Sequence, residues 1–251
     1  MSVHTTQVGE IAHVELARPP ANAMVPEFLN EISAQFLALA QDPMVKAIVL
    51  KGNGRVFSAG MDLKAAASAY DAAASDQLLL GFNRAFGAVY GCLKPVIGAL
   101  NGHAIAGGMV LALCCDYRIA TNTKALFGLT EVRVGVPFPE VAYNIIQDQL
   151  PSTTLRRLIQ FGQNISSDTA LAWGAVDESA EPDQVVDRAH LKAEECLSIP
   201  SRGYSAVKLQ LRGQVIERNA QLIEKENDRY LGHWLDDAAR QAATNVLEGS
   251  A

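Results

Sequence analysis

Two spacings of hydrophobic residues alternate along the first half of the chain. Ile11–Leu16 alternates apolar and polar residues, apart from Ala12, which is typical of a half-buried strand. Pro26–Ala40 instead repeats its apolar residues along one side of a helix. The same patterns recur and predict three short buried strands and a second helix, at Val45–Lys51, Pro95–Leu100, Tyr117–Ala120 and Gln77–Leu93. Because strands alternate with helices, we expect an α/β layered core.

The C-terminal third has a helical pattern throughout. It predicts four helical segments, at Ser152–Phe161, Ser167–Trp173, Asp183–Leu197 and Ser205–Leu247. Ser166 or Ser167 is placed to cap the second of these segments, and Asp183 the third. Since isolated helices are marginally stable in water, we expect the last segment to pack against a neighbouring subunit. The alanine-rich stretch Lys64–Ser75 fits a helix or a mobile loop equally well.

Composition narrows the class of protein. The chain has 251 residues, of which 49% are hydrophobic and 19% charged, enough for one large domain with an ample core or for a domain with a small appendage. The formal charge of −6 argues against a chain-wide nucleic-acid face, because phosphate binding relies on clustered Lys and Arg. A local basic patch for a phosphorylated ligand stays compatible with this charge.

Cysteine usage and hydropathy indicate the compartment. Cys92, Cys114, Cys115 and Cys196 form no CxxC pair, so we expect reduced thiols that are mostly buried. Met1–Gly9 is polar and has no apolar signal core, and no stretch of about 18 apolar residues is present to span a membrane. We therefore expect a soluble, cytoplasmic protein.

Two glycine-rich segments are candidates for binding an oxygen atom that gains negative charge. Small residues in Phe57–Leu63 let a ligand approach the backbone closely, although a tight turn would need them as well. Asn101–Gly108 opens an apolar helix, Met109–Cys115, and the free N–H groups of a helix start attract negative charge. A glycine-rich contact between two helices is the alternative. The sequence argues against a nicotinamide or flavin site, because Phe57 occupies the position of the third glycine that the dinucleotide-binding pattern would need in Gly52–Phe57. It contains no phosphate-binding Walker loop.

The two glycine-rich segments and three further segments of the chain together resemble the successive signatures of the crotonase, or enoyl-CoA hydratase/isomerase, superfamily. The resemblance covers roughly residues 8–250 and includes order and spacing. It implies a spiral of ββα units as an α/β core, residues 1–196, and a C-terminal helical region, residues 197–251, that forms trimers or hexamers and part of the coenzyme A site. The segments are Ala21–Met24, Phe57–Leu63, Asn101–Asp116, Phe127–Val132 and Ile165–Asp177.

The resemblance also implies a role for individual residues. It places the two oxyanion N–H groups at Met61 and Gly107. It implies an acyl-CoA substrate, with coenzyme A as part of that substrate and neither a separate cofactor nor a metal. For Asp62, a helix N-cap is an equally good interpretation. The coenzyme A contacts that the resemblance implies are Ala21, Ala23, Ala59, Asp62 and Leu63.

The carboxylates near the site favour one reaction of this superfamily. Hydratases of the family resemble one another in carrying two catalytic carboxylates, and here the first position is Val110 and the second Glu131. One base suits a proton shuttle, so we expect an isomerase that converts a 3-enoyl-CoA to the 2-enoyl-CoA. Ala106–Ile119 looks particularly like the mitochondrial-type Δ3,Δ2-enoyl-CoA isomerases. Apolar surroundings should raise the pKa of Glu131 towards neutrality, which suits a general base.

Several alternatives stay open. Glu131 could instead be a structural carboxylate paired with Arg133 or Arg118. Glu140 is the alternative candidate for the base, although it could also be a solvated carboxylate in a loop. Hydration of a 2-enoyl-CoA, thioester hydrolysis and a non-catalytic CoA-binding role are the competing functions. Outside the site we expect a packed His103 ring, an Asp116–Arg118 ion pair, packing roles for Trp173 and Trp234, and Lys208 either solvated or facing a CoA phosphate.

Overall fold

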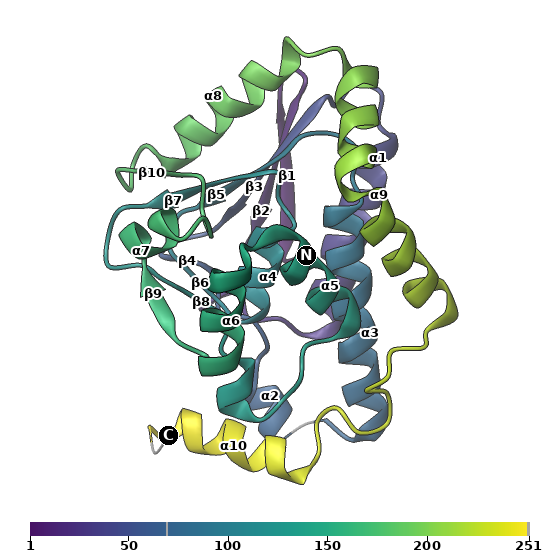
Figure 1. The fold of residues 1–251 in the computed structure, drawn as a ribbon, viewed down its shortest axis with the longest axis vertical. Helices are drawn as coiled ribbons and strands as arrows, with labels where there is room; N and C mark the ends of the chain where they lie inside the picture. The colour runs from purple at the N-terminus through teal and green to yellow at the C-terminus, as the bar shows by residue number, and fades with distance from the viewer. Residues whose placement is uncertain (69, 250–251) are drawn as a thin grey trace.

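A computed structural model, which describes residues 1–68 and 70–249, confirms the expected α/β architecture (Figure 1). Its strands form two sheets. The six-stranded sheet has the order β1 (Val3–Val8), β2 (Ile11–Leu16), β3 (Ala47–Gly52), β5 (Val96–Leu100), β7 (Tyr117–Thr121) and β10 (Glu178–Ala180). The four-stranded sheet has the order β4 (Val56–Ser58), β6 (His103–Ile105), β8 (Leu126–Gly128) and β9 (Asn164–Ser166).

Helices follow the strands in a repeating order. Two strands and then helical structure recur as β1-β2-α1, β3-β4-α2-α3 and β5-β6-α4. In the later repeats the first strand joins the large sheet and the second strand joins the small sheet, which produces the expected spiral of ββα units. The helices are α1 (Pro26–Gln41), α2 (Leu63–Ser68), α3 (Ala72–Tyr90), α4 (Gly107–Leu113), α5 (Glu140–Gln149), α6 (Ser152–Phe161), α7 (Ser167–Ala172), α8 (Val185–Leu197), α9 (Ser201–Lys225) and α10 (Asp237–Leu247), with a short 3-10 helix, η1 (Glu131–Val134).

Both faces of the large sheet are buried. On β3, Ala47 and Val49 belong to a cluster that α8 covers, whereas Ile48 and Leu50 point into the main core with α1 and α3. A strand buried on both faces reads as a continuous apolar run, which is why β3 shows little alternation in the sequence. Figure 1 shows the strands of this sheet lying between α8 and the α1–α3 pair.

The small sheet brings three distant segments to one edge. β4 pairs with β6 in parallel, with Ser58 opposite Ala104, and β6 pairs with β8 in parallel, with Ile105 opposite Gly128. Parallel strands end at the same side of a sheet, so the residues that follow β4, β6 and β8 meet there. These are the segments that begin at Ala59, Ala106 and Leu129.

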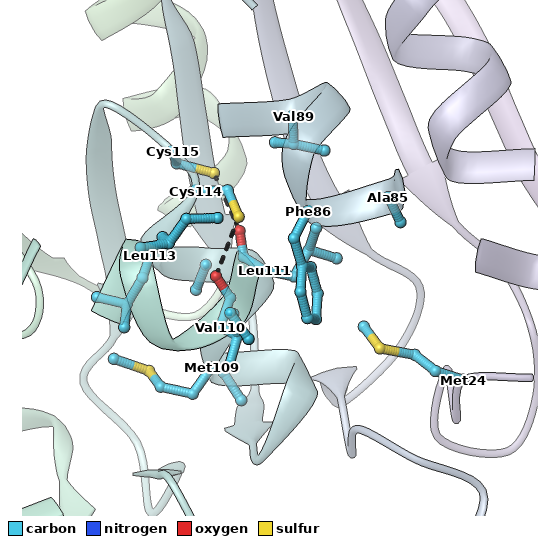
Figure 2. Packing of buried hydrophobic residues seen from close by; sticks show 14 of the residues in the cluster. Met24, Ala85, Phe86, Val89, Met109, Val110, Leu111, Leu113, Cys114 and Cys115 are labelled. Atoms are coloured by element: carbon cyan, nitrogen blue, oxygen red, sulfur yellow. Dashed lines mark hydrogen bonds between the residues drawn. The ribbon is translucent and has the colours of Figure 1, made fainter. Parts of the chain in front are cut away.

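The interior around α4 is apolar. Val110 and Leu111 on this helix belong to the same buried cluster as Phe86 and Val89 of α3 (Figure 2). Cys114 is buried at the end of the helix, and all four cysteines are free thiols, as expected. Burial raises the pKa of the Cys114 thiol, which keeps it protonated. Among the helices that the structure describes, none is both long enough and apolar enough to cross a membrane.

The prediction of continuous helical structure across Ser205–Leu247 is wrong. α9 begins earlier, at Ser201, and ends where Glu226 adopts a left-handed conformation with φ of 44°. α10 starts only at Asp237, capped by the Asp236 side chain. The connection between them buries Trp234 and Leu235 in the main core, so its apolar residues serve tertiary packing rather than a helix face.

Helix starts are partly as expected. The Ser166 side chain accepts from the backbone N–H of Thr169 and caps α7. Asp183 does not cap α8, because Gln184 occupies that position without a side-chain bond. Lys64–Ser75 is divided between α2 and the start of α3, and its residue 69 lies outside the described residues.

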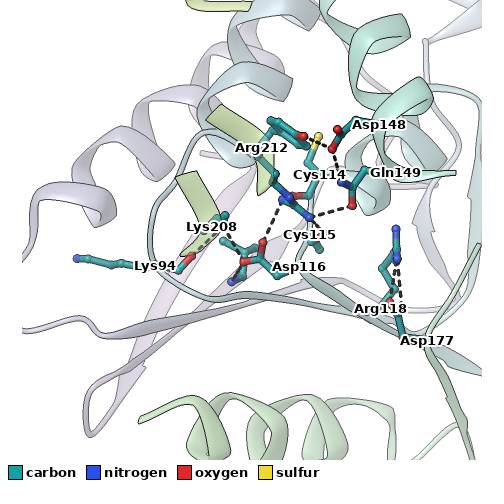
Figure 3. A network of polar contacts seen from close by, with 12 residues as sticks. Lys94, Cys114, Cys115, Asp116, Arg118, Asp148, Gln149, Asp177, Lys208 and Arg212 are labelled. Atoms are coloured by element: carbon teal, nitrogen blue, oxygen red, sulfur yellow. Dashed lines mark hydrogen bonds and ion pairs between the residues drawn. The ribbon is translucent and has the colours of Figure 1, made fainter. Parts of the chain in front are cut away.

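Two predictions about charged residues are also wrong. Arg118 pairs with Asp177 at 2.9 Å instead of with Asp116. Asp116 accepts a hydrogen bond from Lys208 at 2.7 Å and forms an ion pair with Arg212 at 3.0 Å, as Figure 3 shows. Lys208 is therefore buried in an ion pair that ties α9 to the core, and it is neither solvated nor placed for a CoA phosphate.

Candidate active site

A cavity of about 260 Å³ lies where the edge of the small sheet meets the C-terminal segment. Its walls are mostly apolar, which suits a fatty acyl group. α10 and the connection before it contribute Val246 and Trp234. The lining residues are Ala59, Met61, Leu63, Phe82, Phe86, Ile105, Ala106, Gly107, Val110, Thr130, Glu131, Arg133, Val134, Val136, Pro139, Ala142, Asn164, Trp234 and Val246.

Met61 lines this cavity, and its backbone N–H points away from Met24. Met24 and Met61 form an isolated parallel bridge, in which the Met24 N–H donates to Gly60 O at 2.7 Å and Met24 O accepts from the Asp62 N–H at 3.0 Å. A parallel bridge of this kind uses the residues on either side of Met61 and leaves its own N–H facing away from Met24. Within residues 1–68 and 70–249 that N–H has no acceptor.

Gly107 presents a second N–H at the start of α4. As the first helical residue, it cannot donate within the helix. The preceding residue, Ala106, turns the chain with φ of 51°, and its N–H donates to Gly128 O at 2.8 Å. No acceptor for the Gly107 N–H occurs in the described part of the chain.

Gly60 lets the two N–H segments touch. Its φ is +76°, a conformation that favours glycine. A Cβ at this position would lie 2.8 Å from Gly107 N and 2.9 Å from Ala106 Cβ, closer than atoms can approach. The two free N–H groups therefore share one wall of the cavity, an arrangement that can hold an oxyanion.

Glu131 supplies a buried carboxyl group in the same cavity. It begins η1, is 8% exposed, and its Oε2 atom has no hydrogen-bond partner among the described residues. Burial raises the pKa of Glu131 to about 8. The alternative of an ion pair with Arg133 or Arg118 is wrong, because Arg133 donates to Gly162 O and Arg118 pairs with Asp177.

Val110 lies on α4 and lines the cavity, as its position after Gly107 implied. Glu131 is the only carboxylate among the lining residues of the described chain. Glu140 is the first residue of α5 and lies outside the lining, where its carboxylate pairs with Arg229. The structure thus brings Glu131 to the cavity and keeps the alternative base, Glu140, out of it.

The residues implied to contact coenzyme A divide into two groups. Ala59 and Leu63 line the cavity, whereas Ala21 and Ala23 do not. Ala21 O accepts from the Ala59 N–H at 3.0 Å, so the two segments run side by side.

Asp62 serves as a helix cap, the second of its two interpretations. Its Oδ1 accepts from the Ala65 N–H at 3.2 Å at the start of α2, and its Oδ2 pairs with Arg18 at 3.0 Å. Neither contact tests the coenzyme A role of this residue.

Two aromatic residues differ in their relation to the cavity. Trp234 was expected only to pack, but it also lines the cavity; its indole N–H donates to Pro137 O at 2.8 Å and its ring meets Phe82 edge-on. No periodic pattern in the connection before α10 could have revealed this role. His103 is a hydrogen-bonded ring, as expected, with Nδ1 accepting from the Leu126 N–H.

Comparisons with known proteins agree with this site. Residues 6–248 match the family model described as Enoyl-CoA hydratase/isomerase. Carnitinyl-CoA dehydratase from Shigella flexneri is 29% identical over 233 residues, covering 92% of this chain and 85% of the relative. Human mitochondrial delta3-delta2-enoyl-CoA isomerase shares the fold, with a TM-score of 0.91, 23% identity, and coverage of 99% of this chain and 98% of that one.

A Mycobacterium tuberculosis protein is 30% identical, with a TM-score of 0.82 and coverage of 90% of this chain and 94% of that one. One solved structure names it a probable enoyl-CoA hydratase and another names it an enoyl-CoA isomerase. The family match spans nearly the whole chain. The chain therefore belongs to the enoyl-CoA hydratase/isomerase family of the crotonase superfamily.

Proposed function

We propose that the protein is an enoyl-CoA isomerase that moves the double bond of a 3-enoyl-CoA to the 2-position. One observation carries this proposal: Glu131 is the only carboxylate among the lining residues of the described chain, and the apolar Val110 occupies the position of the first of the two carboxylates that hydratases of the family carry. Adding water requires groups that orient the water and transfer its proton. Moving a proton between two carbons of one substrate requires a single base.

The reaction runs through a dienolate. The ionised carboxylate of Glu131 removes a proton from C2 of the 3-enoyl-CoA, and the electron pair of that C–H bond delocalises onto the thioester oxygen. The N–H groups of Met61 and Gly107 hold this oxyanion. Glu131 then returns the proton to C4, the bond between C3 and C4 becomes single, and the bond between C2 and C3 becomes double. No atom is gained or lost.

The geometry favours each part of this step. One oxyanion N–H contributes about 3 kcal/mol to transition-state stabilisation, and two free N–H groups lie on one wall here. A general base works best when its pKa is close to the operating pH, and burial raises the pKa of Glu131 to about 8. The mostly apolar lining offers few groups that could bind a competing water molecule.

The deciding experiment offers the purified protein 3-hexenoyl-CoA and crotonyl-CoA in parallel. Conjugation of the first substrate with its thioester raises the near-ultraviolet absorbance, and hydration of the second lowers it. We expect rapid turnover of 3-hexenoyl-CoA. Turnover of crotonyl-CoA without turnover of the 3-enoyl substrate would make hydration the function, the second candidate, which agrees with the name carnitinyl-CoA dehydratase of one bacterial relative.

The C-terminal region supports a homotrimer or a hexamer as part of the same proposal. α9 has 25 residues, yet its buried side chains are the polar Lys208, Arg212 and Asn219. Val207 and Leu211, one turn apart, are 54% and 75% exposed. A second subunit that covers this face would remove the apolar side chains from water. Light scattering after size-exclusion chromatography tests the assembly: a monomer at micromolar concentration would contradict it.

A further inference from the structure

The segment Asn22–Met24 runs beside the loop that carries the Met61 N–H, and polar bonds join the two. Asn22 is 2% exposed and adopts a left-handed φ of 50°. Its Nδ2 donates to Val56 O at 3.1 Å and to Phe57 O at 3.0 Å. One buried amide side chain therefore binds two successive carbonyl groups of β4, the strand that leads into the loop.

Ser58 continues this connection. Its side chain is fully buried, and its Oγ donates to Asn22 O at 2.8 Å. The same Oγ accepts from the Gly60 N–H at 3.2 Å. The hydroxyl group thereby fixes the peptide unit that precedes Gly60.

The next peptide unit is fixed from its other side. It consists of the Gly60 carbonyl and the Met61 N–H, which point in opposite directions because the unit is planar and trans. The Met24 N–H donates to Gly60 O at 2.7 Å, so the Met61 N–H must point away from Met24. Gly60 lies between these two peptide units, and glycine has the most flexible backbone of all residue types. Without the hydrogen bonds, the two units could rotate relative to each other about Gly60.

We infer that Asn22 and Ser58 are positioning residues that set the direction of the Met61 N–H toward the substrate oxygen. This role rests on the proposed function, in which that N–H holds the dienolate. An N–H group stabilises an oxyanion most when it is aimed before the charge forms, since no reorganisation is then needed. Neither residue lines the cavity, so both act through the loop.

The test uses Ser58→Ala, which removes the hydroxyl group from a fully buried site without adding volume. We expect kcat for 3-hexenoyl-CoA to fall about 10- to 100-fold, since a misplacement of about 1 Å can cost about 100-fold. KM should change less than about twofold, because the N–H acts mainly on the transition state. Asn22→Gly retains a residue that tolerates the left-handed backbone and should show the same pattern.

A measurement without turnover separates this inference from the isomerase proposal. Acetoacetyl-CoA forms an absorbing enolate, and bound N–H donors favour that enolate over the ketone. Titration of each variant with acetoacetyl-CoA at fixed pH should show less enolate than the wild type, whichever reaction the enzyme catalyses. If the wild type forms enolate but turns over only crotonyl-CoA, the isomerase proposal is overturned. The positioning role is still supported in that case when the variants form less enolate than the wild type.

Thr154→Val is the matched control. It removes a buried hydroxyl that donates to Trp173 O at 2.7 Å, away from the cavity, and should leave kcat and enolate formation unchanged. Circular dichroism confirms folding, and if one of the two loop variants does not fold, the other carries the test. Wild-type kcat and enolate absorbance would overturn the inference, and so would a loss confined to KM or to thermal stability.

Discussion

At the scale of single residues, the proposed chemistry depends on a carboxylic acid that the fold keeps among apolar side chains. Glu131 has Phe86 and Val134 among the residues that share its cavity, and its Oε2 atom has no partner in the described chain. Burial disfavours the charged form of a carboxyl group, which is why its pKa rises to about 8. A protonated Glu131 cannot accept a proton, so the activity must depend on the ionisation of this carboxyl group. The stability must depend on it too, because the pKa of Glu131 differs between the folded and the unfolded chain.

The first prediction concerns the pH dependence of activity. In wild-type protein, kcat/KM for 3-hexenoyl-CoA should rise about tenfold per pH unit below pH 8 and level off above it, because the base must be ionised in the free enzyme. Glu131→Gln should lower kcat by about 10²- to 10⁴-fold. Steady-state rates across the pH range check both effects. Glu140→Gln is the control, and a large loss there with a small one at Glu131 would move the base to Glu140.

The second prediction concerns stability. Glu131 titrates near its ordinary value of 4.5 in the unfolded chain and at about 8 in the folded protein, so the folded state binds this proton more tightly. The free energy of unfolding should therefore fall as the pH rises from 4.5 to 8 and stay low above that range. Glu131→Gln should lack this decline and be more stable than the wild type at pH 9. Urea titrations at pH 6 and pH 9 measure the difference, with exposed Glu217→Gln as the control.

The third prediction isolates the contact beneath the two free N–H groups. Gly60→Ala places a Cβ 2.8 Å from Gly107 N, so the oxyanion wall must shift and kcat should fall by about 100-fold or more. Gly54→Ala is the matched control: φ is +78° there, but a Cβ would have nothing within 4 Å. Both variants should lose about 1 kcal/mol or more of stability from the strained backbone. Equal losses of activity would show that backbone strain, and not the contact, matters.

At the scale of elements, the sequence predicts the long members well and the short ones poorly. Four strands of the large sheet, β2, β3, β5 and β7, and helices such as α1 and α6 are long and apolar enough to be recognised, whereas the polar β1 and the three-residue β10 are not predicted. β4, β6, β8 and β9 have three residues each, too few for any pattern, yet they assemble the site. Met61, Gly107 and Glu131 could be named only through the family resemblance. These three residues converge because of the register between strands, and Trp234 reaches the cavity through a tertiary contact. No local sequence pattern encodes either feature.

The fourth prediction tests how the connection before α10 covers the cavity. Trp234→Ala should cost about 3 to 5 kcal/mol of stability, since it removes a buried ring that packs against Phe82. Trp234→Phe should cost about 1 kcal/mol, mainly the hydrogen bond to Pro137 O. Chemical denaturation measures both. A loss of less than about 1 kcal/mol in Trp234→Ala would mean that this connection is not docked in solution.

At the scale of the whole molecule, a buried cluster of charges joins the C-terminal region to the α/β core. Asp116, three residues after the end of α4, forms ion pairs with Lys208 and Arg212 of α9 (Figure 3). Arg212 also donates to the backbone oxygens of Cys114 and Cys115. The apolar side chains of α9 that pack against the core, Val215, Ile216, Leu222 and Ile223, are only partly buried, so these polar bonds contribute to fixing the position of the helix.

This arrangement gives the last prediction. Asp116→Ala leaves two buried cations without their partner, and breaking a buried pair in this way costs about 3 to 5 kcal/mol. Because Val207 and Leu211 lie on the helix that Asp116 holds, the variant should also dissociate at protein concentrations where the wild type stays assembled. The exposed pair Lys192–Glu195 supplies the control, since Glu195→Gln should change stability by less than about 1 kcal/mol. Light scattering and urea titration of both variants separate the two effects: lost stability with intact assembly would mean that α9 is held by its subunit contacts and not by Asp116.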